Sequence, residues 1–177
     1  MKLSTPDLHL LDDVVAERIL EAMHRASKAL TQAGVRHAVC GGLAVGAHGH
    51  PRATKDVDFL VGDEAFIVHS GGFVTMSPGV PIQIDGVAID HLSAKPDEPF
   101  LAKALVEAVE TVGVRVIPVE ALVYMKLRAH RLRDRSDVAE LVHAGLDTAA
   151  CEQWLLTNAP DLCAKFRAIV AEAHAEE

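Results

Sequence analysis

The stretch KDVDFLV, residues 55–61, restricts the fold of this chain more than any other segment. Its residues alternate as in a β-strand, with the apolar side chains on one face, namely Val57, Phe59 and Val61. The other face holds Asp56, Asp58 and Leu60. Two carboxylates on one strand face repel each other, and burying them without partners costs free energy. The acidic face is therefore expected to meet a cation.

A third carboxylate, Asp90, lies in a second apolar stretch, VAIDHL at residues 87–92. If this stretch pairs beside the first, three carboxylates from two adjacent strands lie together. Hard oxygen ligands suit Mg²⁺ or Mn²⁺, which also bind the phosphates of a substrate. We therefore predict a two-metal site formed by Asp56, Asp58 and Asp90, where one ion activates an attacking oxygen and the other holds a triphosphate.

A double glycine, Gly41-Gly42, follows a β-prone stretch and precedes a predicted short helix. Glycine allows backbone N–H groups to approach phosphates closely, and a helix N-terminus favours anions. Arg52 is suited to forked hydrogen bonding with phosphate, and Thr54 stands directly before the aspartates. A double glycine or an Asp-x-Asp pair alone is usually a turn or a solvated pair. Their ordered combination is what predicts nucleotide binding by Gly41, Gly42, Arg52 and Thr54.

Helix and strand patterns alternate up to about residue 118, and the pattern is helical afterwards. Before residue 118 we expect helices over 11–33 and 99–110, strands over 35–40, 55–61 and 114–119, two or three strands within 66–94, and a hairpin turn at Asp85-Gly86. After it we expect helices over about 119–133, 134–144, 148–158 and 160–175. The fold class is therefore α/β (α+β), with a mixed sheet flanked by helices over residues 1–118 and a C-terminal helical cap over 119–177.

Composition narrows the possible partners and compartment. The formal net charge is −8, so we expect any nucleic acid partner to contact a small local surface and not to extend around the protein. Cys40, Cys151 and Cys163 form no CxxC pair and are expected to be core residues in a reducing cytoplasm. Residues 1–7 lack the pattern of a signal peptide, and no apolar stretch approaches the length of a membrane span. We expect a cytoplasmic protein without a membrane partner.

The segment GGLAVGAHGHPRATKDVDFLV, residues 41–61, resembles the signature of the DNA polymerase β nucleotidyltransferase superfamily. In that signature a Gly-Gly or Gly-Ser pair precedes an Asp-x-Asp strand by roughly a dozen residues. The R-x-T before Asp56 resembles the nucleotidyltransferase toxins of abortive-infection and toxin–antitoxin systems. The segment VIPVEALVYMKLRAHRLRDRSDVAEL resembles the same branch, whose members carry a Lys and then an R-x-x-D-x-x-D run, here Lys126, Arg131, Asp134 and Asp137.

The resemblance covers about residues 35–142 and implies a mixed-sheet palm, magnesium, and transfer of a nucleoside monophosphate from an NTP. By this match Gly41 and Gly42 cradle phosphates, and the three aspartates hold metal. Asp90 also serves as a base toward the acceptor hydroxyl. Lys126 neutralises triphosphate charge, and Arg131 is a further nucleotide-binding residue. The acceptor is a hydroxyl of RNA, such as tRNA, or of protein, and an antitoxin protein is a possible partner.

Several alternatives stay open. The acceptor could be a small molecule such as an antibiotic, or the protein could be a non-catalytic nucleotide-binding regulator or an interaction protein. The basic residues Arg128, Arg131 and Arg135 share a stripe on one helix, which is either a solvated face or a phosphate-facing wall. Asp134 and Asp137 are expected to orient Arg or Lys. His91 falls on the face opposite Asp90 and is expected to be structural, as Trp154 is in the C-terminal helices.

Overall fold

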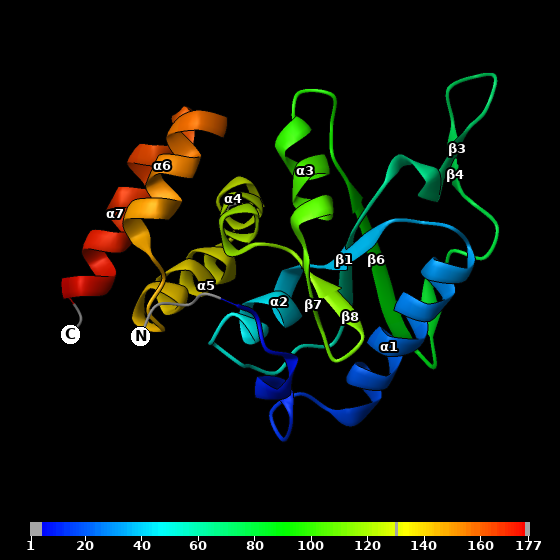
Figure 1. Ribbon diagram of the computed structural model, residues 1–177, viewed down its shortest axis with the longest axis horizontal. Helices are drawn as coiled ribbons and strands as arrows, with labels where there is room; N and C mark the ends of the chain where they lie inside the picture. Colours follow the sequence, from blue (N-terminus) through cyan, green and yellow to red (C-terminus); the bar gives the residue numbers. More distant parts are fainter. Residues whose placement is uncertain (1–4, 130, 176–177) are drawn as a thin grey trace.

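A six-stranded sheet forms the centre of the computed structural model, which describes residues 5–129 and 131–175 (Figure 1). Residues 1–4, part of the segment examined for a signal peptide, lie outside the described residues. The strands follow the order β5-β6-β2-β1-β8-β7. Their bounds are β1 His37–Val39, β2 Val57–Val61, β5 Gln83–Ile84, β6 Val87–Ser93, β7 Val109–Thr111 and β8 Val114–Val116. The pairs β2–β6 and β1–β8 are parallel and the others antiparallel, so the predicted mixed sheet is confirmed.

A separate hairpin, β3 Phe66–Val68 and β4 Val74–Met76, projects from the body beside the sheet (Figure 1). The segment 66–94 therefore holds four strands, where two or three were predicted. The turn between β5 and β6 is at the predicted position: Asp85 and Gly86 both have positive φ, at 48° and 79°. Two consecutive residues of this kind define a tight hairpin turn, which fixes the pairing of β5 with β6.

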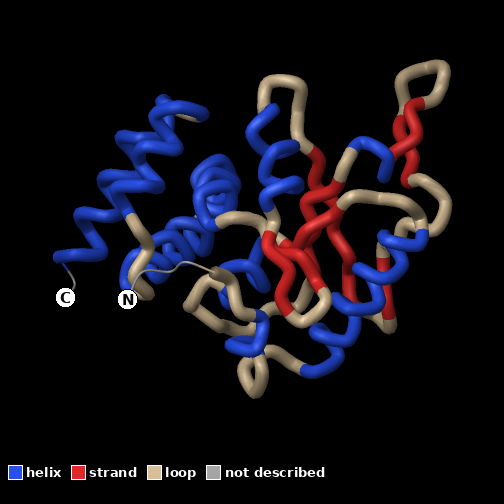
Figure 2. The backbone as a smooth tube through the Cα atoms, in the orientation of Figure 1, coloured by secondary structure: helices blue, strands red, loops and turns tan. Residues whose placement is uncertain are grey.

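One face of the sheet is covered by α1, Glu17–Gln32 (Figure 2). Its buried side chains recur at helical spacing, namely Ile19, Met23, Ala26 and Leu30. From the strands, Phe59 is fully buried and its ring lies edge-on to His37. The predicted start of this helix at residue 11 is wrong, because Asp13 adopts a φ of 65° that a helix cannot contain.

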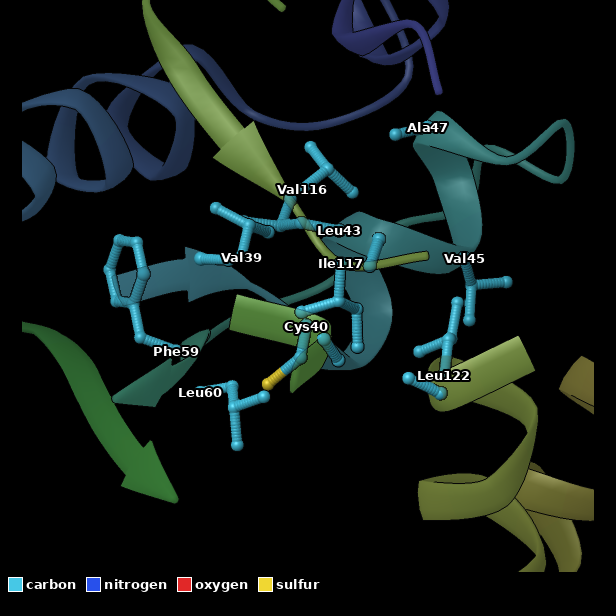
Figure 3. Packing of buried hydrophobic residues seen from close by; sticks show 14 of the residues in the cluster. Val39, Cys40, Leu43, Val45, Ala47, Phe59, Leu60, Val116, Ile117 and Leu122 are labelled. Carbon is cyan, nitrogen blue, oxygen red and sulfur yellow. The ribbon is translucent and has the colours of Figure 1, made fainter. Parts of the chain in front are cut away.

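The opposite face of the sheet packs against α2, Gly41–Ala47, which in turn packs against α4, Val119–Ala129. Figure 3 shows Cys40, Leu60, Ile117 and Leu122 meeting in this layer. Leu60 lies on the same face of β2 as Asp58 but is fully buried, whereas Asp58 is only partly buried. The apolar layer therefore ends where the carboxylates begin.

The remaining helices gather beside α4 (Figure 1). Their bounds are α3 Pro99–Glu107, α5 Leu132–His143, α6 Thr148–Asn158 and α7 Cys163–Ala175. The predicted helix over 99–110 is too long, because β7 begins at Val109. The predicted boundary at 133/134 falls earlier, since α4 ends at Ala129 and α5 begins at Leu132. The division of the chain at residue 118 stays a prediction.

The residues expected in the core are buried or partly buried. Cys40, before α2, and Cys151 and Cys163, in the C-terminal helices, are free and buried, as predicted. Trp154 is partly buried and meets the ring of Phe100 edge-on, with centroids 5.3 Å apart. Within the described part of the chain, no helix has the length and apolar character that crossing a bilayer requires.

Candidate active site

Three carboxylates line one pocket where β2 lies beside β6. The two strands are parallel, and Asp58 stands directly opposite Asp90 in their register. Asp56 precedes β2 by one residue and, being two residues from Asp58, belongs to the same face. All three line one pocket of about 180 Å³. The predicted pairing of the two acidic stretches is therefore confirmed.

The carboxylates are close enough to affect one another's charge. Burial, together with the negative charges of Asp56 and Asp90, raises the pKa of Asp58 to about 6 against the opposing effect of Lys126 and the Gly42 backbone. Thr54 holds the neighbouring carboxylate in place, because its Oγ1 donates a hydrogen bond to Asp56 Oδ1 at 3.1 Å. The site thus stores electrostatic repulsion that a bound cation would relieve.

The double glycine makes room for these groups. Gly41 has a φ of 60°, and a Cβ added to it would lie 1.9 Å from Asp58 Oδ2. A Cβ on Gly42 would lie 3.1 Å from Thr54 Oγ1 and 3.4 Å from Arg52 Nη2. Only glycine fits at position 41 without displacing the carboxylate. The predicted contact of Gly41 and Gly42 with phosphates stays a prediction.

Lys126, on α4, is the most buried cation of the pocket, with 7% of its surface exposed. Its Nζ donates hydrogen bonds to Asp137 Oδ2 at 2.7 Å and to Asp134 Oδ1 at 3.1 Å. The expectation that Asp134 and Asp137 orient a basic side chain is confirmed. An ammonium group has three donors, so one remains available to the pocket.

Two arginines extend this network in opposite directions. Arg52 binds Asp137 with two hydrogen bonds, from Nε at 2.7 Å and from Nη2 at 2.8 Å. Arg131 donates from Nε to Asp134 Oδ2 at 2.8 Å. Burial raises the pKa values of Asp134 and Asp137, but the hydrogen bonds from arginine and lysine outweigh it and hold both pKa values below the ordinary range. The result is an alternating chain of charges: Arg52, Asp137, Lys126, Asp134 and Arg131.

The predicted arginine stripe is wrong. Arg128 is on α4 and pairs with Asp161 at 2.6 Å, whereas Arg135 is on α5 and pairs with Glu172. Because Arg131 has an extended backbone and caps the start of α5, whereas Arg128 lies within α4, the three arginines do not share one helix face. Arg131 alone of the three lines the pocket, together with Arg133, which sequence reasoning missed. The break between the helices is the signal that would have separated them.

The histidines near the site have other roles. His48 is buried and shares a hydrogen bond of 2.8 Å between its Nε2 and the carbonyl oxygen of Ile117, and burial lowers its pKa. His91 lies on the face opposite Asp90, as predicted, where its ring stacks on Phe59 with centroids 6.4 Å apart. Its Nε2 is 2.6 Å from the carbonyl oxygen of Pro81. Neither histidine lines the carboxylate pocket.

A second, smaller pocket of about 90 Å³ adjoins the first and shares Asp58, Lys126, Arg131 and Asp134 with it. Its remaining lining is mostly apolar, from Leu92, Leu122, Met125 and Ala129. Leu92 lies two residues beyond Asp90 on the same strand face and is 41% exposed. The carboxylates are thus bordered by an apolar surface on one side and by cations on the other.

The donor set suits magnesium or manganese in its chemistry. Within the described part of the chain, no three acidic, histidine or cysteine side chains converge closely enough to enclose one ion. Magnesium does not need such a cage, because it commonly takes one or two carboxylates and completes its shell with water and substrate phosphates. Asp56, Asp58 and Asp90 supply hard oxygen atoms around one pocket, which fits that mode of binding.

Comparisons with known proteins give matches in structure but none in sequence. No family model matches the sequence, and no curated protein matches it. Among solved structures, the chain is similar to an antigenic nucleotidyltransferase-like protein from Paracoccidioides brasiliensis. The sequence identity is 15%, the TM-score is 0.47, and the likeness covers 88% of this chain and 94% of that one.

Proposed function

We propose that this protein is a metal-dependent nucleotidyltransferase, which transfers a nucleoside monophosphate from an NTP to an acceptor hydroxyl. The observation that carries the proposal is the pairing of Asp58 with Asp90 on neighbouring parallel strands, with Asp56 lining the same pocket. Three like charges on one sheet face destabilise the fold unless a cation joins them. Such an arrangement is retained for a function, not for stability.

The charges of the pocket are divided between two walls. One wall holds Asp56, Asp58 and Asp90, and the other holds Arg52, Lys126, Arg131 and Arg133. On the second wall, the four positive charges are only partly balanced by Asp134 and Asp137. A nucleoside triphosphate with divalent cations complements both walls, because the cations neutralise the carboxylates while the phosphates meet the basic residues.

The residues then have separate roles. Asp56 and Asp58 hold magnesium or manganese, which when bound stabilises charge on the transferred phosphate. Asp90, exposed at the pocket and opposite Asp58, accepts the proton of the acceptor hydroxyl. Lys126 has one donor left after binding its two aspartates and directs it toward the phosphates. Thr54 keeps Asp56 oriented.

The acceptor we propose is a hydroxyl group of RNA, such as tRNA, or of protein. This choice rests on the resemblance of residues 35–142 to the toxin branch of the superfamily, which also makes a cytoplasmic toxin with an antitoxin partner the expected biological setting. An exposed arginine, Arg131, stands at the rim of the pocket with 76% of its side chain accessible and is suited to contact an acceptor phosphate.

A labelling experiment tests the proposed reaction. The protein is incubated with each NTP labelled at the α- or the γ-phosphate, with magnesium and with total tRNA, lysate protein or a hydroxyl-bearing antibiotic. We expect the α-label, and not the γ-label, to join one acceptor while pyrophosphate is released. Asp58→Asn should lower this transfer by about a hundredfold or more, because it removes a charged ligand of the cation that stabilises the reacting phosphates.

The control is the stability of the same variant. Asp58→Asn removes a like charge from the cluster and keeps the side-chain shape, so its free energy of unfolding without magnesium should equal or exceed that of the wild type. Transfer of the γ-label would identify a kinase and contradict the proposal. Undiminished α-label transfer by folded Asp58→Asn would contradict the assignment of the site.

A further inference from the structure

Arg133 differs from the other arginines around it. It is the second residue of α5, its side chain is exposed, and it lines the carboxylate pocket. Arg128, Arg131 and Arg135 each form an ion pair with an acidic side chain. For Arg133 the structure shows no such pair with any residue of 5–129 or 131–175. It is thus a pocket cation whose hydrogen-bonding groups are available.

The neighbouring cations are less free to follow a ligand. Lys126 and Arg52 are fixed by hydrogen bonds of 2.7 Å to the buried carboxylate of Asp137. Arg133 has no corresponding anchor and stands at the start of a helix, so its long side chain can move over the pocket. A guanidinium group presents several N–H donors in a planar fork that matches two phosphate oxygens at once.

We propose that Arg133 binds the polyphosphate tail of the donor nucleotide and thereby makes the site select nucleoside triphosphates over monophosphates. The inference rests on the proposed function, because it assigns a ligand to the same pocket. Arg133 shares that pocket with all three aspartates and with Lys126. A donor whose phosphates lie between these two groups brings its β- and γ-phosphates toward the basic wall, where Arg133 is the cation without a protein partner among the described residues.

The contribution of Arg133 to binding should depend on how many phosphates the nucleotide carries. A monophosphate bound at the carboxylates through a divalent cation does not extend to the basic wall, whereas a triphosphate does. Removing the guanidinium should therefore weaken triphosphate binding and leave monophosphate binding unchanged. The same loss should appear with inorganic tripolyphosphate, which carries the phosphate chain without a base or a sugar.

The test is a titration calorimetry series with Arg133→Gln, Arg133→Lys and the matched control Arg135→Gln, each with magnesium. Arg135 is two residues further along α5 and pairs with exposed Glu172, so its replacement makes the same chemical change away from the pocket. The probes are the four NTPs, the four NMPs and tripolyphosphate. We expect Arg133→Gln to weaken NTP and tripolyphosphate binding by about tenfold, or about 1.4 kcal/mol, with NMP affinity unchanged. Arg133→Lys should lose less, and Arg135→Gln nothing.

The remaining results would contradict the role of Arg133, the proposed nucleotidyltransferase function, or both. Equal NTP affinity in wild type and Arg133→Gln contradicts the role of Arg133. Binding of tripolyphosphate, lost in Arg133→Gln, with no binding of any NTP contradicts the proposed function but supports a phosphate contact at Arg133. Binding of neither probe by the wild type overturns both.

Discussion

Asp58 depends on a residue seventeen positions earlier in the chain, Gly41. The backbone at Gly41 has a φ of 60°, and its missing side chain leaves the space that Asp58 Oδ2 occupies. The glycine thus serves the carboxylate in two ways, through its conformation and through its size. Both residues were predictable as site residues, but for different groups of the ligand, because a close approach between the start of α2 and a side chain of β2 has no local sequence signal.

Replacing Gly41 with alanine should affect both stability and binding. The left-handed conformation alone costs a non-glycine residue about 1–3 kcal/mol. The added Cβ would lie 1.9 Å from Asp58 Oδ2, so the carboxylate must also move. We expect Gly41→Ala to lower the free energy of unfolding in urea and to abolish the stabilisation that magnesium and NTP give to the folded protein.

Gly34→Ala is the control for this prediction. Gly34 has a similar φ of 72°, but a Cβ there would meet no atom within 4 Å. This variant should share the backbone strain and keep wild-type NTP binding. If Gly41→Ala bound magnesium and NTP as well as Gly34→Ala does, the contact between Gly41 and Asp58 would have no functional meaning.

The positions of the arginines were only partly predictable from the sequence. Arg52 and Arg131 were predicted to line the pocket from their position in motifs, and both do. Arg128 and Arg135 were grouped with them by helical spacing, yet they pair with Asp161 and Glu172. Arg133 was not singled out at all. Spacing assigns residues to one face only if the helix is continuous, and this helix ends at Ala129.

At the scale of elements, α5 is attached to the rest of the fold through charges. Asp134 and Asp137, each 2% exposed at the side chain, connect α5 to Lys126 of α4, and Asp137 also binds Arg52 in the loop before β2. Removing one member of a buried ionic network leaves the others without a partner in a medium that solvates them poorly. The packing of α5 and the positions of two pocket cations therefore depend on the same carboxylates.

Asp137→Asn should destabilise the protein in a pH-dependent way. The pKa of Asp137 is held below its ordinary value, so its stabilisation is fully present above the ordinary pKa of aspartic acid and is lost as pH falls through the lowered one. We expect the variant to lose about 3–5 kcal/mol of unfolding free energy at pH 7. The difference from wild type should shrink below about pH 4, where the unfolded state begins to bind protons.

Urea unfolding at a series of pH values between neutral and strongly acidic measures this difference. Glu172→Gln is the control, because it removes one partner of an exposed ion pair with Arg135 and should change stability little at any pH. A constant difference between wild type and Asp137→Asn across the series would show that the carboxylate charge is not what stabilises the network.

Elements with a strong repeating pattern were predictable, and short ones were not. The alternation in residues 55–61 and the apolar stretch at 87–92 correctly predicted β2 and β6, and the two strands do pair, as the predicted metal site required. The strand β7, of three residues, was absorbed into a predicted helix, because Val109–Thr111 is too short to show a period of its own. It forms a strand only because β8 is beside it, and that pairing is a tertiary contact.

At the scale of the whole molecule, the carboxylates and basic residues of the candidate site lie on one side of the sheet. The α1 face is apolar and closed, whereas the other face is closed by α2 and α4 only up to Leu60. Beyond that point the carboxylates and the basic wall form the pocket. A net charge of −8 repels phosphates from most of the surface, so the local group of basic residues determines where a nucleotide binds.

The central claim is that this pocket binds an NTP together with a divalent cation, and thermal unfolding tests it without knowledge of the acceptor. The melting temperature is recorded with each of the four NTPs, with and without magnesium, for wild type and Asp56→Asn. A ligand that binds only the folded state at a hundredfold excess over its Kd stabilises by about 2.7 kcal/mol. We predict an increase for at least one NTP that requires magnesium and is absent in Asp56→Asn. No increase with any NTP, or an equal increase in Asp56→Asn, would contradict the claim.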